Sequence, residues 1–268
     1  MTVAPLEPAS RRPKVHALPE HDRDQDPSSP WLSIVLPAHN EADHIGVVAL
    51  GFLRAAERTG RSAEVLVIDD GSTDDTAGAV RAWPGGDDPR VRIIRRERCG
   101  GYGKALISGF HHARGEWVFF TDADGQFSPD ELPGFLDAID GDQPLMIAGY
   151  RNPRRDNAPR RLLGKAWTAV VRAVLRVESR DVNCAYKVMR KADLDAMALL
   201  SSGAMINAEL LHKARRLGVQ LRERPVTHLP RLSGEQSGAR PDVMARALYE
   251  LARYRAESAQ RALLRLLG

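Results

Sequence analysis

Residues 116–127 read EWVFFTDADGQF, a short aromatic and aliphatic run that stops at two aspartates, Asp122 and Asp124. Three other apolar runs stop at polar residues in the same way, at PAHNE (37–41), DDGSTDD (69–75) and GYR (149–151). Helical patterns fill the intervals between these runs. Strands of four to seven residues that alternate with helices predict an α/β fold, with a mostly parallel sheet and helices on both of its faces.

The polar ends of these runs predict one shared ligand site. In open sheets of parallel strands, ligands bind outside the carboxyl ends of the strands. Each of the four polar motifs lies at the end of its apolar run, so all four belong to that edge. We therefore expect a single site that is assembled from four strand ends.

The composition is that of an ordinary folded protein. The chain has 268 residues, of which 43% are hydrophobic and 28% charged, which is enough for one large domain. Residues 1–30 are rich in Pro, Asp, Arg and Ser without an apolar period, which predicts a disordered leader. We expect the main domain to span residues 31–238 and a C-terminal helix to occupy residues 239–268.

The two cysteines, Cys99 and Cys184, are far apart and lie in no metal-binding spacing. This usage favours a reducing, cytoplasmic setting over a disulfide framework. No run approaches the roughly 18 to 20 apolar residues that cross a bilayer. Any membrane contact is therefore expected to be peripheral, on the inner face of the cell membrane.

Residues 151–180 form a basic segment, with nine basic side chains against two acidic ones. Within it, residues 158–178 have the period of an amphipathic helix or helix pair, with Trp167 and Val171 on one side and Arg161 and Lys165 on the other. Such a segment attracts anions, and an anionic lipid surface is one candidate partner. The alternative is a helix packed on the sheet with its arginines in water. Nucleic acid is not expected, because no reading motif is present.

The DADGQ motif is open to two interpretations. Asp122 and Asp124 would face the same side of an extended strand, and two hard carboxylates suit Mg²⁺ or Mn²⁺. An isolated motif of this kind is also a common polar strand end or turn. A calcium loop of the EF-hand type is excluded, because Phe127 and Pro133 occupy the positions that need Gly and Glu.

The DDGSTDD motif predicts a helix start, with Ser72 or Thr73 as the N-cap. That cap does not explain Asp70, because a second acid at a buried strand end is costly unless it meets a donor. Further along, CGGYGKAL (99–106) fails both the P-loop and the dinucleotide fingerprints by spacing. It remains a glycine loop at a helix start, either near a diphosphate or a simple turn.

In this order and spacing, PAHNE, VIDDGSTDDT, GGYGKALISGF, FFTDADGQFSPDEL and GYR resemble the family 2 glycosyltransferases of the GT-A fold, which is Rossmann-like. The nearest group is the polyprenyl-phosphate and dolichyl-phosphate mannosyl- and glucosyltransferases. The resemblance covers about residues 32–235 and implies a GT-A domain with interface helices at about residues 158–178.

The resemblance also implies roles for individual residues. By position, the nucleotide would lie against Pro37, His39, Glu41 and Asp70. The divalent cation, Mg²⁺ or Mn²⁺, would be held by Asp122, Asp124 and Gln126. The donor and acceptor phosphates would meet Arg151, Arg161, Lys165 and Arg231, with Asp124, Arg151, Arg161 and Arg231 in the catalytic group and Lys165 on the acceptor phosphate. His39 departs from the tyrosine that is usual there.

The function implied is inverting, metal-dependent transfer of a hexose, with mannose from GDP-mannose favoured, to polyprenyl phosphate. A lipid phosphate is already anionic near neutral pH, so no general base is required. A second hypothesis keeps the nucleotide-sugar donor but uses a soluble sugar, small molecule or protein as acceptor, with Asp181 as the base. A third is a non-catalytic protein that binds anionic membrane surfaces through residues 151–180.

Overall fold

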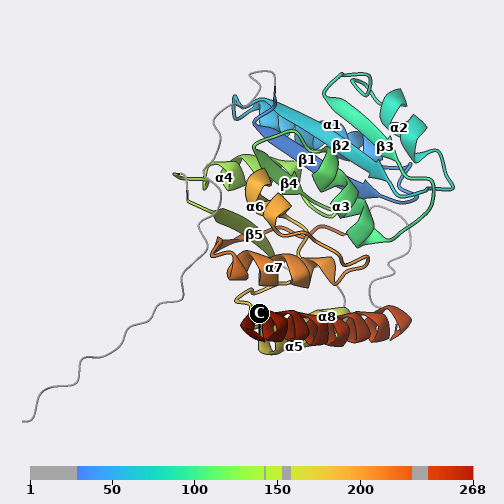
Figure 1. Ribbon diagram of the computed structural model, residues 1–268. Helices are drawn as coiled ribbons and strands as arrows, with labels where there is room; N and C mark the ends of the chain where they lie inside the picture. Colours follow the sequence, from blue (N-terminus) through green and yellow to red (C-terminus); the bar gives the residue numbers. More distant parts are fainter. Residues whose placement is uncertain (1–28, 142, 153–157, 231–240, 268) are drawn as a thin grey trace, which may run out of the picture.

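A computed structural model describes residues 29–141, 143–152, 158–230 and 241–267. In these residues, seven strands form one sheet in the order β3-β2-β1-β4-β6-β5-β7 (Figure 1). The strands are β1 Leu32–Ala38, β2 Ala63–Asp69, β3 Val91–Arg95, β4 Trp117–Phe120, β5 Leu145–Arg151, β6 Lys187–Arg190 and β7 Gln220–Val226. The helices are α1 Ile45–Glu57, α2 Thr76–Ala82, α3 Tyr102–His112, η1 Pro129–Glu131, α4 Leu132–Leu136, α5 Ala158–Leu175, α6 Lys191–Ala196, α7 Ile206–Arg216 and α8 Pro241–Leu267.

The predicted mostly parallel sheet is confirmed, with one reversed strand. Strands β1 to β4 run parallel to one another, and β7 runs parallel to β5. Strand β6 is antiparallel to both β4 and β5. The sequence patterns did not predict β6, because its four residues, KVMR, are too short for a period to show.

Helices cover both faces of the sheet, as predicted. Consecutive strand residues point to opposite faces, and two phenylalanines of β4 show where each face leads. The Phe119 ring packs on Phe52 of α1, with ring centroids 5.5 Å apart. The Phe120 ring packs on Phe110 of α3, also at 5.5 Å. Helices α1 and α3 therefore lie on opposite sides of the central strands.

The amino ends of the central strands are tied together by Glu64, which is 2% exposed. Its carboxylate accepts hydrogen bonds from the Ser33 hydroxyl at 2.8 Å and the Arg114 backbone nitrogen at 2.9 Å. The guanidinium groups of Arg92 and Arg114 also reach it, each at 2.8 Å. One carboxylate thus joins β1, β2, β3 and the turn before β4.

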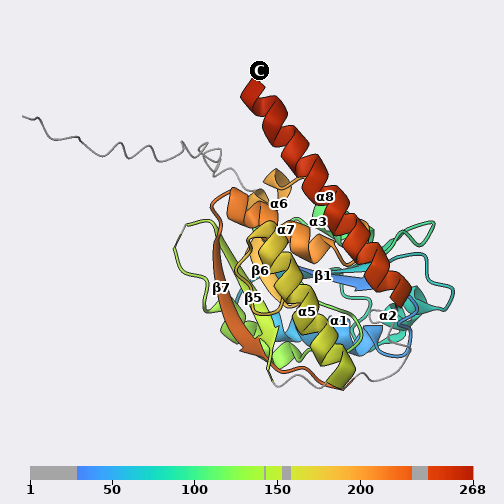
Figure 2. The same cartoon turned by 90° about the horizontal axis from the view of Figure 1, so that it is seen from below.

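Helices α5 and α8 lie together on one side of the molecule, beyond α7 (Figures 1 and 2). Trp167, Val171 and Leu175 of α5 are buried, whereas Arg161 and Lys165 are exposed. The predicted amphipathic helix is therefore present. In the described part of the chain, no helix is both long enough and apolar enough to span a bilayer.

The predicted helix cap after β2 was wrong. The N-cap of α2 is Asp75, whose side chain accepts a hydrogen bond from Gly78 N at 3.1 Å. The Ser72 hydroxyl instead accepts a hydrogen bond from Asn40 N at 3.0 Å, and Thr73 N donates to the Asn40 side chain at 2.8 Å. Ser72 and Thr73 therefore join two loops, and the helix starts later.

Two predicted boundaries fall where the structure gives no description. Residues 1–28 of the predicted leader lie outside the described residues, as does the boundary at residue 238. Helix α8, at Pro241–Leu267, occupies most of the predicted C-terminal segment. The division into a leader, a main domain and a C-terminal helix stays a prediction.

We predict that Glu64→Ala lowers the free energy of unfolding by about 2–3 kcal/mol, because hydrogen bonds to a charged group contribute about 1.5–3 kcal/mol. Chemical denaturation at pH 7 measures the change. Glu57→Ala is the control, because Glu57 and its partner Arg90 are each 45% exposed, and a surface pair of this kind contributes at most about 1 kcal/mol.

The effect of Glu64→Ala should also depend on pH. Burial raises the pKa of Glu64, but hydrogen bonds from Arg114 and Arg92 outweigh burial and hold the pKa below its ordinary value of 4.5. The stabilisation by the carboxylate is therefore complete above that value and is lost as the pH falls through the folded-state pKa. Equal losses at pH 7 and in strong acid would contradict this assignment.

Candidate active site

The carboxyl ends of β1, β2, β4 and β5 meet at one edge of the sheet, as predicted. Ala38 pairs with Asp69, and Val35 pairs with Phe120, so the ends of three strands lie side by side. Strand β5 runs in the same direction, because β6 is antiparallel to both β4 and β5. The loops that follow these strands therefore share one side of the molecule.

The four residues expected to contact the nucleotide lie together on β1, β2 and the loops after them. Pro37 pairs with Ile68 inside the sheet. The exposed His39 ring donates through Nδ1 to the Asp70 carbonyl at 3.0 Å. Glu41 N donates to the Thr76 hydroxyl at 3.1 Å. These contacts hold the loops after β1 and β2 against each other.

The Asp70 carboxylate, 3% exposed, holds the glycine loop. It accepts hydrogen bonds from Gly100 N at 3.1 Å and Gly101 N at 2.8 Å, and it forms an ion pair with Arg96. The Cys99 thiol lies 3.5 Å from the same carboxylate. This explains the second acid at the end of β2, which the helix cap did not explain.

The start of α3 is also held by protein contacts. The backbone nitrogens of Gly103 and Lys104 donate to the Ser202 carbonyl at 2.8 and 3.4 Å. Gly101 has a φ of 94°, and a Cβ there would lie 2.8 Å from Ser202 O. Because these amides already have acceptors, the structure supports the turn interpretation of the glycine loop over a diphosphate cradle.

Asp122 and Asp124 lie in the loop directly after β4, and their environment fits a divalent cation. Burial and, after it, the charge of Asp124 raise the pKa of Asp122, which is about 7 after the lowering effects that include the charge of Arg151. Two neighbouring carboxylates repel each other unless one takes a proton or a cation lies between them. Their hard oxygens suit Mg²⁺ or Mn²⁺.

Gln126 is placed beside Asp124. Gln126 N donates to Asp124 Oδ1 at 3.0 Å, and its side-chain Nε2 donates to the Leu229 carbonyl at 3.2 Å. No group of three or more His, Cys, Asp and Glu side chains in the described ranges could hold a metal ion. The protein ligands in this loop would therefore be two carboxylates and one amide, and the rest would come from the ligand or water.

Two further side chains lie beside this loop. His228 is 3% exposed, forms a β-bridge with Phe127 and packs its ring on Phe127 at 5.7 Å. The Tyr102 hydroxyl is buried and lies close enough to Asp122 to affect the pKa of that carboxyl. Tyr102 was missed from the sequence, where it looked like part of a glycine turn.

The Arg151 guanidinium is bound to Asp181. Arg151 Nε lies 2.6 Å from Asp181 Oδ2, and the second nitrogen of the fork lies 2.8 Å from Oδ1. The two side chains are 12% and 8% exposed. Both oxygens of Asp181 are thus engaged, which removes the support for Asp181 as a free general base.

The remaining predicted phosphate contacts are not brought to the strand ends. Arg161 and Lys165 are exposed on α5, and no hydrogen bond or ion pair connects them with the strand-end residues that the structure describes. Arg231 lies outside the described residues. The structure therefore brings together residues that were expected at the nucleotide and the cation, and within the described ranges it shows no contact between them and Arg161 or Lys165 of α5.

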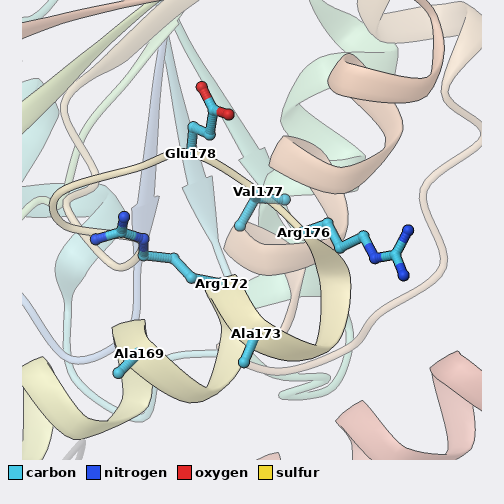
Figure 3. A pocket seen from close by; sticks show the side chains of 6 residues that line it. All are labelled: Ala169, Arg172, Ala173, Arg176, Val177 and Glu178. Atoms are coloured by element: carbon cyan, nitrogen blue, oxygen red, sulfur yellow. The ribbon is translucent and has the colours of Figure 1, made fainter.

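A shallow depression of about 550 Å³ lies at the end of α5. Figure 3 shows its lining, in which the Arg172 and Arg176 side chains extend in opposite directions from the helix that also carries Ala169 and Ala173. None of the strand-end residues lines it. It belongs to the basic surface of α5 and is separate from the carboxyl edge of the sheet.

Residues 33–198 match the family described as "Glycosyl transferase family 2", which is more than half of the chain. The chain belongs to glycosyl transferase family 2. Curated relatives of this family 2 chain include an undecaprenyl-phosphate 4-deoxy-4-formamido-L-arabinose transferase from Shewanella sediminis (strain HAW-EB3), 31% identical over 62% of the chain and 50% of the relative. A protein of the same name from Edwardsiella ictaluri (strain 93-146) is 26% identical over 76% of the chain and 62% of the relative.

The family 2 chain thus spans about half to three fifths of the length of these relatives. Among solved structures, glucosyl-3-phosphoglycerate synthase from Mycobacterium tuberculosis, in complex with Mn²⁺, UDP and glucosyl-3-phosphoglycerate, has a TM-score of 0.63 at 20% identity. The alignment covers 84% of this chain and 80% of the synthase chain. Mannosyl-3-phosphoglycerate synthase from Rubrobacter xylanophilus has a TM-score of 0.65 at 18% identity and covers 87% and 75%. These likenesses confirm the GT-A fold.

We predict that Asp70→Asn speeds the reaction of the Cys99 thiol with a disulfide reagent at pH 7. Burial raises the pKa of Cys99, and the Asp70 carboxylate raises it further, while the hydrogen bonds of Asp70 hold the loop in place. Removing the charge lowers the thiol pKa and loosens the loop. Cys184 is buried, so the absorbance of the thiolate that the reagent releases measures the reaction of Cys99.

Asp74→Asn is the control for this experiment. Asp74 is exposed in the same DDGSTDD motif, but its side chain accepts from Ala42 N and Thr76 and makes no contact with the glycine loop. It should leave the labelling rate unchanged. Equal rates for Asp70→Asn and the wild type would show that Asp70 does not hold the loop.

Proposed function

We propose that this chain transfers a sugar from a nucleotide-sugar donor to polyprenyl phosphate with the help of a divalent cation. The observation that carries the proposal is the pairing of two sites at one sheet edge. The His39 and Asp70 loops lie at the ends of β1 and β2, and the Asp122 and Asp124 carboxylates follow the adjacent β4. A nucleoside diphosphate bound at this edge would use both a base pocket and a cation site.

The named relatives support the acceptor. Both are undecaprenyl-phosphate sugar transferases, and the family match includes the loops that carry His39, Asp70 and Asp124. The synthases of similar fold include a complex with Mn²⁺ and UDP. By analogy we assign the nucleotide to Pro37, His39, Glu41 and Asp70, and the cation to Asp122, Asp124 and Gln126.

The residues of this chain suit the chemistry of such a transfer. Leaving of a nucleoside diphosphate develops negative charge, and a bound divalent cation would stabilise that charge. Arg151, held by Asp181 near the Asp122 carboxylate, adds a fixed positive group at the same place. A phosphate acceptor attacks as an anion, so the engaged state of Asp181 causes no difficulty.

We assign the acceptor side to the basic face of α5. Arg161 and Lys165 are exposed there beside Leu162, which is 71% exposed. Cations next to an exposed apolar side chain suit a phosphate at a lipid surface. Arg231 is proposed for the same phosphate from its position in the sequence. In this scheme the protein contacts the inner face of the cell membrane peripherally.

The resemblance and the named relatives indicate different sugars. The resemblance favours a hexose, with mannose from GDP-mannose first. The named relatives are transferases of 4-deoxy-4-formamido-L-arabinose. His39 stands where tyrosine is usual in the family, so the base contact gives no ground for choosing GDP over UDP. A donor comparison therefore belongs in the first experiment.

We predict that the protein moves label from a nucleotide-sugar into the organic phase when undecaprenyl phosphate and Mn²⁺ are present. The donors to compare are GDP-mannose, UDP-glucose and the UDP form of 4-deoxy-4-formamido-L-arabinose. Asp122→Asn should lower the rate at least about a hundredfold, as expected when a group that stabilises developing charge is lost. Asp130→Asn, at an exposed acid paired with Arg58, should leave the rate unchanged.

Two outcomes would count against this proposal. Folded protein that transfers no label from any of the three donors to the lipid would remove the acceptor assignment. Vesicle binding without transfer would instead favour the non-catalytic alternative. Asp122→Asn should then bind vesicles as the wild type does, because it leaves the basic surface of α5 intact.

We also predict that Mn²⁺ binding weakens as the pH falls from 8 to 6. The cation competes with the proton that Asp122 takes up at a pKa of about 7, so the affinity should be about tenfold lower at pH 6. Calorimetric titration with Mn²⁺ measures it. Asp122→Asn should abolish the pH dependence together with most of the binding, and an unchanged affinity across this range would contradict the ligand assignment.

A further inference from the structure

Lys187 is a fully buried lysine at the start of β6, with no exposed surface. Its ammonium donates to the Val182 carbonyl at 3.2 Å, to the Cys184 carbonyl, and to the Asn207 side-chain oxygen at 3.0 Å. A lysine has three donors, and all three are used. Burial lowers the pKa of Lys187 to about 8. A group this costly to bury calls for an explanation.

The direction of β6 places Lys187 at the candidate site. Because β6 is reversed, its first residue lies at the edge where the other strands end, opposite Phe120 of β4 and Ala148 of β5. Tyr186, one residue earlier, packs on Phe119 on the other face, with ring centroids 4.6 Å apart. Lys187 therefore points to the α3 and α7 side, where its charge acts on Asp122.

Two of the acceptors of Lys187 belong to the irregular segment of residues 181–185. This segment has almost no strand or helix contacts to satisfy its carbonyl groups. At one end, Asp181 holds Arg151 by two hydrogen bonds, at 2.6 and 2.8 Å. In the middle, the Asn183 side chain accepts a hydrogen bond from Trp167 Nε1 of α5 at 3.1 Å.

We propose that Lys187 is a positioning residue that fixes the segment of residues 181–185. Through this segment, Arg151 is set beside the Asp122 and Asp124 loop, called here the cation corner, and α5 is set against the body of the protein. Asp181 links the segment to Arg151, and Asn183 links it to Trp167. The segment thus couples the donor side of the site to the helix that carries Arg161 and Lys165.

The inference rests on the proposed function only in naming one side of the site as the donor side and α5 as the acceptor side. The contacts themselves can be tested without turnover. Hydrogen exchange followed by mass spectrometry reports whether residues 181–185 and α5 are held. Calorimetric titration with Mn²⁺ plus GDP, and separately with Mn²⁺ plus UDP, measures the nucleotide affinity and so reports on the arrangement of Arg151, Asp122 and Asp124.

The central variant is Lys187→Met, which removes the three hydrogen bonds and keeps an unbranched side chain. Exchange in residues 181–185 and in α5 should become at least about tenfold faster, since one hydrogen bond alone corresponds to about threefold to tenfold. The affinity for the nucleotide with Mn²⁺ should fall by a similar factor. Lys191→Met is the matched control at the far end of β6, where Lys191 pairs with Asp195 on the surface, and it should change neither.

Two single-contact variants separate positioning from general loss of stability. Trp167→Phe removes the Nε1 hydrogen bond to Asn183 and part of a buried ring, so exchange in α5 should rise at least about threefold to tenfold. Nucleotide affinity should stay at the wild-type value. Asp181→Asn should give the reverse pattern, with weaker nucleotide binding and unchanged exchange in α5. In the transfer assay the same split should appear as a higher KM for the lipid with Trp167→Phe and for the donor with Asp181→Asn.

Lys187→Met that exchanges at the wild-type rate in both segments would overturn the proposal. So would Trp167→Phe and Asp181→Asn variants that alter both readouts equally. If Lys187→Met does not fold, Asn207→Ala removes one acceptor and keeps the lysine, and it must show the same changes at smaller size. If no donor is transferred but the exchange pattern holds, the proposed function falls and the positioning role stands.

Discussion

The common direction of β1, β2, β4 and β5 is the constraint on which the candidate site depends. Parallel strands end at one edge, so the polar residues that follow each strand must lie on the same side of the molecule. The buried Glu64 ties the amino ends of β1 and β2 to β3 and to the turn before β4. With the register held at that end, the loops after Ala38, Asp69 and Phe120 leave the sheet side by side.

The reversed strand β6 is what lets one edge hold both signs of charge. It separates the ends of β4 and β5 by two strand spacings, about 10 Å, and it brings its own first residue, Lys187, to that edge. The acidic loop after β4 therefore faces Lys187 and the Arg151–Asp181 pair. A divalent cation would enter a place where the carboxylates are enclosed and only partly balanced, which is consistent with the raised pKa of Asp122.

Loops that look like ligand cradles in this protein are held by protein groups. The amides of the glycine loop meet the Asp70 carboxylate and the Ser202 carbonyl. Glu209, which is fully buried, in turn accepts hydrogen bonds from Leu200 N and Ser201 N and so holds the segment that carries Ser202. The glycines permit close packing of two backbones, and the acid at the end of β2 provides the acceptor.

Much of the fold could be predicted from the sequence, because apolar runs, helical periods and the polar ends of strands are local patterns. The resemblance led us to expect Pro37, His39, Glu41 and Asp70 at a nucleotide, and the structure brings these four residues together. Strand β6 and the start of α2 were missed. A four-residue strand has no readable period, and in DDGSTDD every Ser, Thr and Asp is an eligible cap, so tertiary contacts with Asn40 decided which one was used.

By itself, the sequence determined which side chains lie at strand ends and which helix is basic on one face, since both follow from spacing along the chain. Only the tertiary structure decided which partner each charge has. Arg151 was expected at a phosphate and is bound to Asp181, and the unremarked Lys187 is a buried cation beside Asp122. Charge pairing depends on distances between residues far apart in sequence, and strand direction sets those distances.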